Sequence, residues 1–269
     1  MRTSNCLNNK DNRIMNQTER RIYLIKYLLD EMHVELNIPK DTNEQRRLLR
    51  ALFNVRLPKE IDEEFLKIQD EYLKERIEEK GITDIDMLNE IQKQIYLWKG
   101  DITTLRCDCI VNAANSQMLG CFCPNHGCID NAIHTYAGIQ LRNECNMQMN
   151  KESRDILITD AYNLPSSKII HVVGPIIQDV VREEDIQHLR SCYRRSLELA
   201  EKNGMKSIAF CCISTGEFHF PNGLACEIAI QIVQKYLKET KSGMKVIFNV
   251  FKEEDYELYR TMLNNQTDN

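Results

Sequence analysis

Four side chains of the kinds that bind zinc lie in one short segment of the chain: Cys121, Cys123, His126 and Cys128. Thiolate and imidazole groups at such short spacing favour a zinc site in a protein of a reducing compartment. Three protein ligands would leave one position open for water or substrate, as catalytic zinc requires, whereas four would close the site. The segment therefore predicts zinc binding, and at this point it allows both a catalytic and a structural site.

Three polar turns that follow strand-like runs are the other candidates for chemistry. Segment 100–103 is a Gly-Asp turn, and segment 111–115 places Asn112 and Asn115 on either side of two alanines. Amides both donate and accept hydrogen bonds, and the small residues between them let a ligand approach the backbone. Segment 213–221 precedes a helix, where successive backbone N–H groups suit a diphosphate. Taken singly, each turn also fits an ordinary structural loop.

The elements that must position these turns alternate along the second part of the chain. Short β-branched runs predict strands at 94–97, 109–112, 156–159, 169–173, 207–214 and 246–251. Amphipathic stretches predict helices at 129–145, 184–203, 221–239 and 253–263. Such alternation indicates a layered α/β domain with a mostly parallel sheet, in which ligands bind at the carboxyl ends of the strands.

The first part of the chain has a helical pattern instead. Apolar residues recur at helical spacing within 21–32, within 48–53 and, after Pro58, within 65–73. Thr42 and Gln45 have the spacing of a capping box before the second run. The polar, Asn-rich ends predict disorder at 1–16 and 265–269. We therefore divide the chain into a helical extension at 17–88 and an α/β domain at 89–264.

Composition narrows the classes of function. The chain has 269 residues and a net charge of -5, which argues against nucleic acid as a partner because a backbone binder usually has a basic stripe. No apolar run approaches the ~20 residues of a membrane span, and no secretory signal pattern is present. Eleven cysteines in such a chain indicate a reducing, cytoplasmic location. Four of them are expected in the core: Cys107, Cys109, Cys211 and Cys212.

Together, five segments resemble the motifs of the macrodomain family: GDIT at 100–103, IVNAAN at 110–115, DNAIH at 130–134, HVVGP at 171–175 and ISTGEFHFP at 213–221. That family binds ADP-ribose, and many of its members remove ADP-ribose from modified proteins. The resemblance implies a three-layer α/β/α fold with a mixed sheet, here with an N-terminal helical extension. It implies ADP-ribose and mono-ADP-ribosylated proteins as partners.

The chain departs from the common hydrolytic pattern just before Asp130. A run of glycines that is usual there is replaced by GCFCPNHGC at 120–128, and in this the chain resembles the zinc-containing branch of the family, N-terminal helices included. Cys123 falls at a position that this branch does not use, so it is either a bystander, which we favour, or a fourth ligand that closes the site. The ligand pattern of the branch selects Cys121, His126 and Cys128.

The resemblance also implies roles for individual residues. Asp101 would accept a hydrogen bond from the adenine amino group beside Ile102, and Phe251 would pack on the adenine unless it is a core residue. The diphosphate would be held by the backbone of Ser214, Thr215, Gly216, Glu217 and Phe218. The distal ribose would lie near Asn112, Asn115, Cys128, Ile129 and Asp130, with Asn115 and Asp130 as the catalytic residues.

These roles predict cleavage at the anomeric carbon of the distal ribose through an oxocarbenium-like transition state. Zinc would activate a water or fix a ribose hydroxyl, and Asp130 would act as a general base or orient the reactants. Our preferred hypothesis is a zinc-dependent hydrolase that removes mono-ADP-ribose from oxygen-linked side chains. The alternative is a non-catalytic reader of ADP-ribose with a structural zinc. The acidic balance disfavours a third hypothesis, a zinc-knuckle-like nucleic-acid binder.

The sequence assigns no catalytic or binding role to the remaining features. His134 lies one helical turn after Asp130 and is expected to be structural, and His171 and His219 have no assigned role. We expect the N-terminal helices to pack on the α/β domain, in a position to border its pocket.

Overall fold

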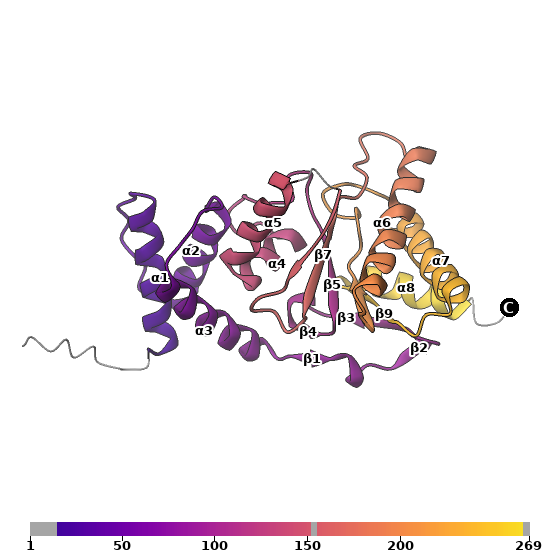
Figure 1. Ribbon diagram of the computed structural model, residues 1–269, viewed down its shortest axis with the longest axis horizontal. Coiled ribbons are helices and arrows are strands. Elements are labelled where there is room, and N and C mark those ends of the chain that lie inside the picture. The colour runs from indigo at the N-terminus through magenta and orange to yellow at the C-terminus, as the bar shows by residue number, and fades with distance from the viewer. Residues whose placement is uncertain (1–14, 152–154, 266–269) are drawn as a thin grey trace, which may run out of the picture.

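The computed structural model describes residues 15–151 and 155–265, and its centre is a seven-stranded mixed sheet (Figure 1). The five inner strands are parallel, and the two edge strands, β2 and β6, run antiparallel to their neighbours. The order across the sheet is β2 (Glu90–Gln92), β3 (Ile95–Lys99), β9 (Lys245–Val250), β8 (Ser207–Phe210), β5 (Cys109–Ala113), β7 (Lys168–Val172) and β6 (Ile156–Asp160). A separate two-stranded sheet pairs β1 (Thr83–Asp84) with β4 (Leu105–Arg106).

Helices cover both faces of the large sheet, as its inner strands require. Strand β8 is buried along its whole length and β5 nearly so, because parallel strands with helices on both faces are almost continuously apolar. On one side lie α4 (Ile129–Ala137) and α5 (Ile139–Lys151) (Figure 1). On the other side lie α6 (Glu183–Lys202), α7 (Asn222–Thr240) and α8 (Glu253–Asn265). The predicted three-layer α/β/α fold with a mixed sheet is confirmed.

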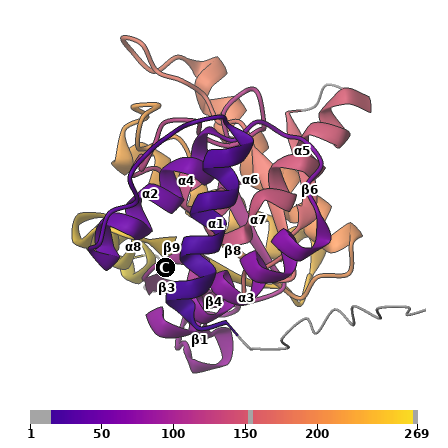
Figure 2. The same cartoon turned by 90° about the vertical axis from the view of Figure 1, so that its left-hand side faces the viewer.

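The N-terminal extension adds a further layer of helices outside α4 and α5 (Figures 1 and 2). It consists of α1 (Gln17–Glu31), α2 (Thr42–Val55) and α3 (Glu63–Lys80), whose apolar faces form a second core around Leu24, Leu28 and Phe65. The two cores interlock, because Ile139 of α5 belongs to the core of the extension and Ile77 of α3 belongs to the core of the sheet. The extension therefore packs directly on the α/β domain, as we expected.

The sequence placed several element ends incorrectly. The expected single helix at 129–145 is broken at Gly138, which has a φ of 102°, and the N–H of Ile139 then donates to Gln69 of α3. Strand β8 ends at Phe210 rather than at 214. The N-cap of α2 is Asp41, whose side chain accepts from the N–H groups of the next turn, so the capping box expected at Thr42 is wrong by one residue.

The proposed division at residue 88 falls between the last helix of the extension and strand β2. The predicted disordered ends lie outside the described residues, except for Met15, Asn16, which caps α1, and Asn265, which ends α8. Among the described cysteines none forms a disulfide, and Cys107, Cys109 and Cys211 are buried, whereas Cys212 is half-buried. In the described residues no helix is both long enough and apolar enough to cross a membrane.

Candidate active site

Most of the predicted site residues lie on loops that leave the carboxyl ends of four neighbouring parallel strands, whereas Asn112 lies within β5 and Asp130 lies in the first turn of α4. Asp101 follows β3, Asn115 follows β5, Ser214 follows β8 and Phe251 follows β9. Since parallel strands present their carboxyl ends at one edge of a sheet, these loops meet at that edge. The sheet topology therefore brings together segments that are far apart in the sequence.

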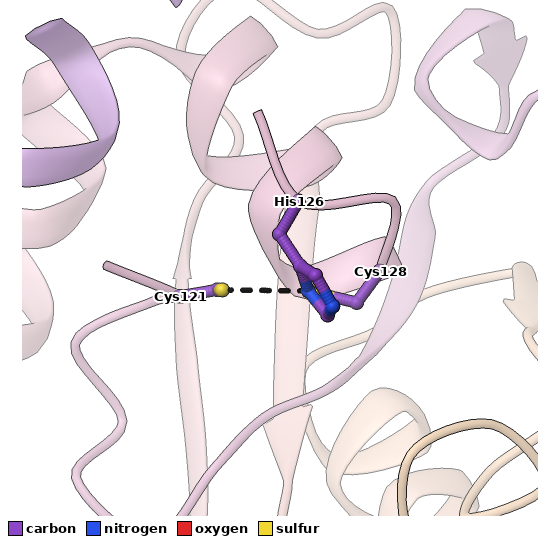
Figure 3. Close-up of side chains that lie close together, drawn as sticks. All are labelled: Cys121, His126 and Cys128. Carbon is purple, nitrogen blue, oxygen red and sulfur yellow. Dashed lines mark hydrogen bonds between the residues drawn. The ribbon is translucent and has the colours of Figure 1, made fainter. Parts of the chain in front are cut away.

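The three predicted metal ligands converge in the loop between β5 and α4 (Figure 3). The Sγ atom of Cys121 lies 3.7 Å from Nδ1 of His126, and the donor atoms of Cys121, His126 and Cys128 all lie within 4.8 Å of one another. Bond lengths of about 2.0–2.3 Å would place tetrahedral zinc ligands roughly 3.5–3.8 Å apart. Two thiols and an imidazole at this spacing therefore fit zinc. Cys123 is exposed and lies outside the group.

Local structure holds two of these ligands in place. Cys128 is the N-cap of α4, and its Sγ accepts from the N–H of Asn131 at 3.4 Å. His126 directs Nδ1 toward Cys121, and its other ring nitrogen, Nε2, lies 3.6 Å from a carboxylate oxygen of Glu217. A carboxylate on the second nitrogen of a metal-binding histidine fixes the ring and its tautomer. Glu217 comes from the loop after β8, residues 211–221, which is the predicted diphosphate loop. This loop therefore lies beside the metal-ligand loop, residues 114–128 between β5 and α4.

Asp130 lies at the start of α4 and is only 4% exposed. The Nδ2 group of Asn112 donates to Asp130 at 2.8 Å and also lies 3.1 Å from Nδ1 of His171. Burial raises the pKa of Asp130 to about 6, against the opposing hydrogen bond from Asn112. Burial also lowers the pKa of His171 to about 3, so this ring is neutral, and its Nε2 atom lies 3.0 Å from Thr159 Oγ1. Asn112 thus holds the carboxylate of Asp130 by a hydrogen bond, a role that its position in the motif does not reveal.

Asn115 is half-buried and closes the beginning of the metal-ligand loop. Its Nδ2 donates to the carbonyl oxygen of Gly120 at 3.1 Å, and its Oδ1 accepts from the N–H of Gln117 at 3.0 Å. These bonds make Asn115 a loop-shaping residue in this structure. Its direct contact with a ribose stays a prediction, as does that of Ile129, which is half-buried at the start of α4.

The loop after β8 carries several backbone N–H groups that have no partner in the described part of the protein. Within the described residues, the backbone N–H groups of Ser214, Gly216, Glu217 and Phe218 donate to no other group of the protein. Ser214 has a φ of 66° and closes the turn by accepting the N–H of Phe220 at 2.9 Å. Successive free N–H groups of this kind form a nest for an anion such as a diphosphate. Gly174 leaves room for this turn, since a Cβ there would lie 2.1 Å from Ser214 Oγ and 2.8 Å from Ile213 Cγ2.

The predicted adenine contacts lie together at the ends of β3 and β9. The N–H of Gly100 donates to Val250 at 3.0 Å, which joins the turn of Asp101 to the strand that precedes Phe251. Phe251 is 76% exposed, so it is not a core residue and its ring is free to pack on a ligand. Ile102 is buried behind Asp101.

The carboxylate of Asp101 is anchored by the extension. Lys80, the last residue of α3, forms an ion pair with it and donates to Thr103 Oγ1 at 3.2 Å. Burial raises the pKa of Asp101, but the bonds from Lys80 and Thr103 outweigh it and hold the pKa below its ordinary value. The extension therefore borders the site, as expected.

A second set of contacts ties α2 to the metal-ligand loop. Arg50 donates to the carbonyl oxygen of His126 at 2.9 Å and to Oδ1 of Asn131 at 2.7 Å. Asn54 accepts the N–H of Asn125 at 2.9 Å, and Arg142 of α5 donates to Leu119 and to three carbonyls at the end of α2. These residues were missed at the sequence level, because no local pattern marks contacts between positions so far apart.

The histidines differ in their surroundings. His134 is buried, and this burial is the main reason why its pKa lies well below 6.5. The ring is therefore neutral, as expected of a structural residue. Neither of its ring nitrogens has a hydrogen-bond partner within the described residues, although Nε2 lies 3.5 Å from Asp130. His219 is exposed, in the diphosphate loop, with a φ of 56°.

The fold and the candidate site define the class of the protein. Residues 111–229 match the family model of the Macro domain. The chain is 48% identical over 260 residues to a protein-ADP-ribose hydrolase of Treponema medium, covering 93% of this chain and 100% of that one. It is 43% identical to a protein-ADP-ribose hydrolase of Staphylococcus aureus strain MSSA476, covering 89% and 95%. The chain therefore belongs to the protein-ADP-ribose hydrolases of the macrodomain family, which are hydrolytic enzymes.

A solved structure also matches a larger share of the chain than residues 111–229. The Trypanosoma brucei macrodomain in complex with ADP-ribose superposes with a TM-score of 0.61 at 30% identity, over 80% of this chain and 94% of that one.

Proposed function

We propose that this chain is a zinc-dependent hydrolase that removes mono-ADP-ribose from oxygen-linked side chains of modified proteins. The observation that carries the proposal is the group of Cys121, His126 and Cys128 beside the buried carboxylate of Asp130, at the edge of the sheet where the nucleotide would lie. The names of the relatives support the ADP-ribosylated substrate, and the donor set supports zinc.

Different groups of the protein would bind different parts of ADP-ribose. Asp101 would accept from the adenine amino group, and Phe251 would cover the face of the base. The free N–H groups of Ser214, Gly216, Glu217 and Phe218 would hold the diphosphate, which directs the distal ribose toward the metal-ligand loop. The fixed placement of these groups would orient the anomeric carbon, and orientation is itself a large part of the rate enhancement of enzymes.

The reaction cleaves the bond between the anomeric carbon and the side-chain oxygen, and water supplies the new oxygen on that carbon. Asp130 would accept a hydrogen bond or a proton from this water, while Asn112 holds the carboxylate in place. The proton leaves with the freed side chain or is transferred to solvent. A bound zinc with three protein ligands would supply an open position that polarises an oxygen at the distal ribose.

The alternative, a reader with a closed zinc site, needs a fourth protein ligand. Cys123 was the candidate, but it is exposed and stands outside the group formed by the other three side chains. The arrangement therefore favours an open site. The cytoplasmic location inferred from the cysteines stays a prediction.

The test uses a protein that carries mono-ADP-ribose on glutamate, incubated with the chain before and after a zinc chelator. We expect release of ADP-ribose that stops with the chelator and returns with added zinc. Cys128→Ser should lose zinc and activity yet keep its fold, because serine is itself a good N-cap for α4.

Cys123→Ser is the matched control and should retain both zinc and activity. A substrate with ADP-ribose on the nitrogen of arginine should not be cleaved. If the zinc-loaded protein binds ADP-ribose but releases none from any modified protein, the chain is a reader and the proposal is wrong.

A further inference from the structure

A cleft of about 400 Å³ lies between α2 and α3 of the extension and α4 of the α/β domain. Its wall carries four arginines, Arg46, Arg47 and Arg50 from α2 and Arg76 from α3. This concentration of positive charge occurs in a chain whose net charge is -5.

Acidic side chains do not neutralise these arginines one for one. Among the described residues, Glu79 forms the ion pairs of both Arg46, at 3.7 Å, and Arg76. Within the described part of the chain, Arg50 bonds only to uncharged groups and Arg47 forms no ion pair. The Nε group of Arg46 is buried and has no hydrogen-bond partner among those residues. The cleft thus holds guanidinium groups with unused donors.

The phenol of Tyr72, which also lines the cleft, reports the same excess of positive charge. Burial raises the pKa of Tyr72, while the charges of Arg76, Arg21 and Arg46 oppose that rise. Arg46 and Arg76, which line the cleft, thus act on this phenol as well. Guanidinium groups bind carboxylates in paired hydrogen bonds, so the cleft fits a ligand with several carboxylates.

The cleft lies next to the metal-ligand loop. Asn125 of the metal-ligand loop lines it, and Arg50 joins its wall to the carbonyl of His126. In the proposed function, on which this step rests, the distal ribose and its attached protein lie at that loop. On that proposal, the protein part of the substrate would lie beside the cleft.

We propose that the arginine cleft between α2, α3 and α4 binds an acidic segment of the ADP-ribosylated protein substrate. The cleft thereby selects the protein rather than the nucleotide. Its contribution falls on association with the modified protein, since exposed charges at an interface mainly steer the encounter and weaken as salt rises.

Arg47→Glu is the sharpest variant, because Arg47 is exposed and no ion pair of the described chain is lost with it. Lys74→Glu, an exposed residue of α3 outside the cleft, makes the same change of charge and is the control. A fluorescein-labelled decaglutamate peptide is the probe, with binding followed by anisotropy at low salt. We expect Arg47→Glu to weaken peptide binding about fivefold or more, Arg47→Lys to retain most of it, and Lys74→Glu to match wild type.

Kinetics provide the second readout. With a modified protein whose ADP-ribosylated residue is flanked by acidic residues, Arg47→Glu should raise KM about fivefold and leave kcat and the Kd for free ADP-ribose unchanged. Equal peptide binding by wild type and Arg47→Glu, or no binding by either, overturns the inference. So does Arg47-dependent binding of inorganic phosphate without binding of decaglutamate, which would make this a phosphate site.

The two proposals fail separately. Arg47-dependent binding of decaglutamate by a protein that releases no ADP-ribose would sink the hydrolase and leave the acidic-segment site standing. Normal release of ADP-ribose with no effect of Arg47→Glu in either assay would do the reverse.

Discussion

The guanidinium of Arg50 donates to the carbonyl oxygen of His126 at 2.9 Å, and this bond joins a helix of the N-terminal extension to a candidate metal ligand 76 residues away. The same guanidinium holds Asn131, whose Nδ2 in turn donates to the carbonyl of Cys123. The extension is therefore part of the framework of the metal-ligand loop. A loop of irregular backbone gains from such external support, since zinc binds best to ligands that are already in place.

Replacement of Arg50 by methionine should weaken zinc binding about tenfold, because partners that orient metal ligands typically contribute this much or more. Arg47→Met, which removes a cation from the same helix without touching the loop, should leave zinc affinity unchanged. Competition with a chromophoric chelator measures both, at a temperature where circular dichroism shows all variants folded. Equal zinc affinity of the two variants would show that the loop holds its shape without α2.

Replacement of Gly174 by alanine should distort the diphosphate loop. The added Cβ would lie 2.1 Å from Ser214 Oγ, so the loop must shift, at a cost of about 1–3 kcal/mol in stability. We expect ADP-ribose affinity, measured by calorimetry, to fall about tenfold or more. Adding Ser214→Gly removes the closest clash, at a position with a φ of 66°, and should restore part of the binding, because Ile213 Cγ2 would still lie 2.8 Å from the added Cβ.

A suitable control for this pair is Gly223→Ala, because a Cβ at Gly223 meets nothing within 4 Å. Its ADP-ribose affinity should equal that of wild type. Binding by Gly174→Ala that also matches wild type would mean that the loop adapts to the larger residue.

Replacement of Phe251 by alanine should separate ligand binding from folding. The side chain is 76% exposed, so the free energy of unfolding should change by less than about 0.5 kcal/mol. Loss of stacking on adenine should lower the affinity for ADP-ribose about tenfold, since one base–aromatic stack contributes about 1–3 kcal/mol. The affinity for ribose 5-phosphate, which has no base, should not change. Val180→Ala, at another exposed apolar residue, is the control, and an equal loss of affinity there would contradict the assignment.

The ion pair of Glu31 with Arg56 should make the stability of the extension depend on pH. Burial of Glu31 raises its pKa, but two hydrogen bonds from Arg56, at 2.8 and 2.9 Å, and the charges of Arg56 and Lys59 lower it below the ordinary 4.5. Because the folded pKa is depressed, this stability is present above about pH 4.5 and is lost as pH falls through the folded pKa.

Glu31→Gln should therefore lower the free energy of unfolding at pH 7 by about 2 kcal/mol and flatten its decline below pH 4.5. Denaturant titrations at a series of pH values measure this, with Glu35→Gln, an exposed neighbour, as the control. An unchanged pH profile in Glu31→Gln would show that other carboxylates govern the acid sensitivity.

The sequence was most informative where the relevant interactions are local. Close spacing within one loop marked four candidate zinc ligands, and the resemblance to the zinc-containing branch selected Cys121, His126 and Cys128, whose donor atoms lie together in the structure. The alternation of strands and helices predicted the layers, since the apolar faces of both elements follow their own periods. The exposure of Phe251 was left undecided, because a strand end can face either the core or a ligand.

Other features were decided only by packing between distant segments. The break between α4 and α5 depends on Gln69 of α3, which satisfies the N–H of Ile139. The support of Asp130 by Asn112 follows from the junction of β5 with α4, and the bond from Arg50 to His126 follows from the packing of α2 on that same helix. Sequence motifs and the apolar periodicity of helices and strands describe only the neighbours of a residue along the chain. Which distant polar group reaches it depends on how two apolar cores fit together, and that is a property of the folded protein as a whole.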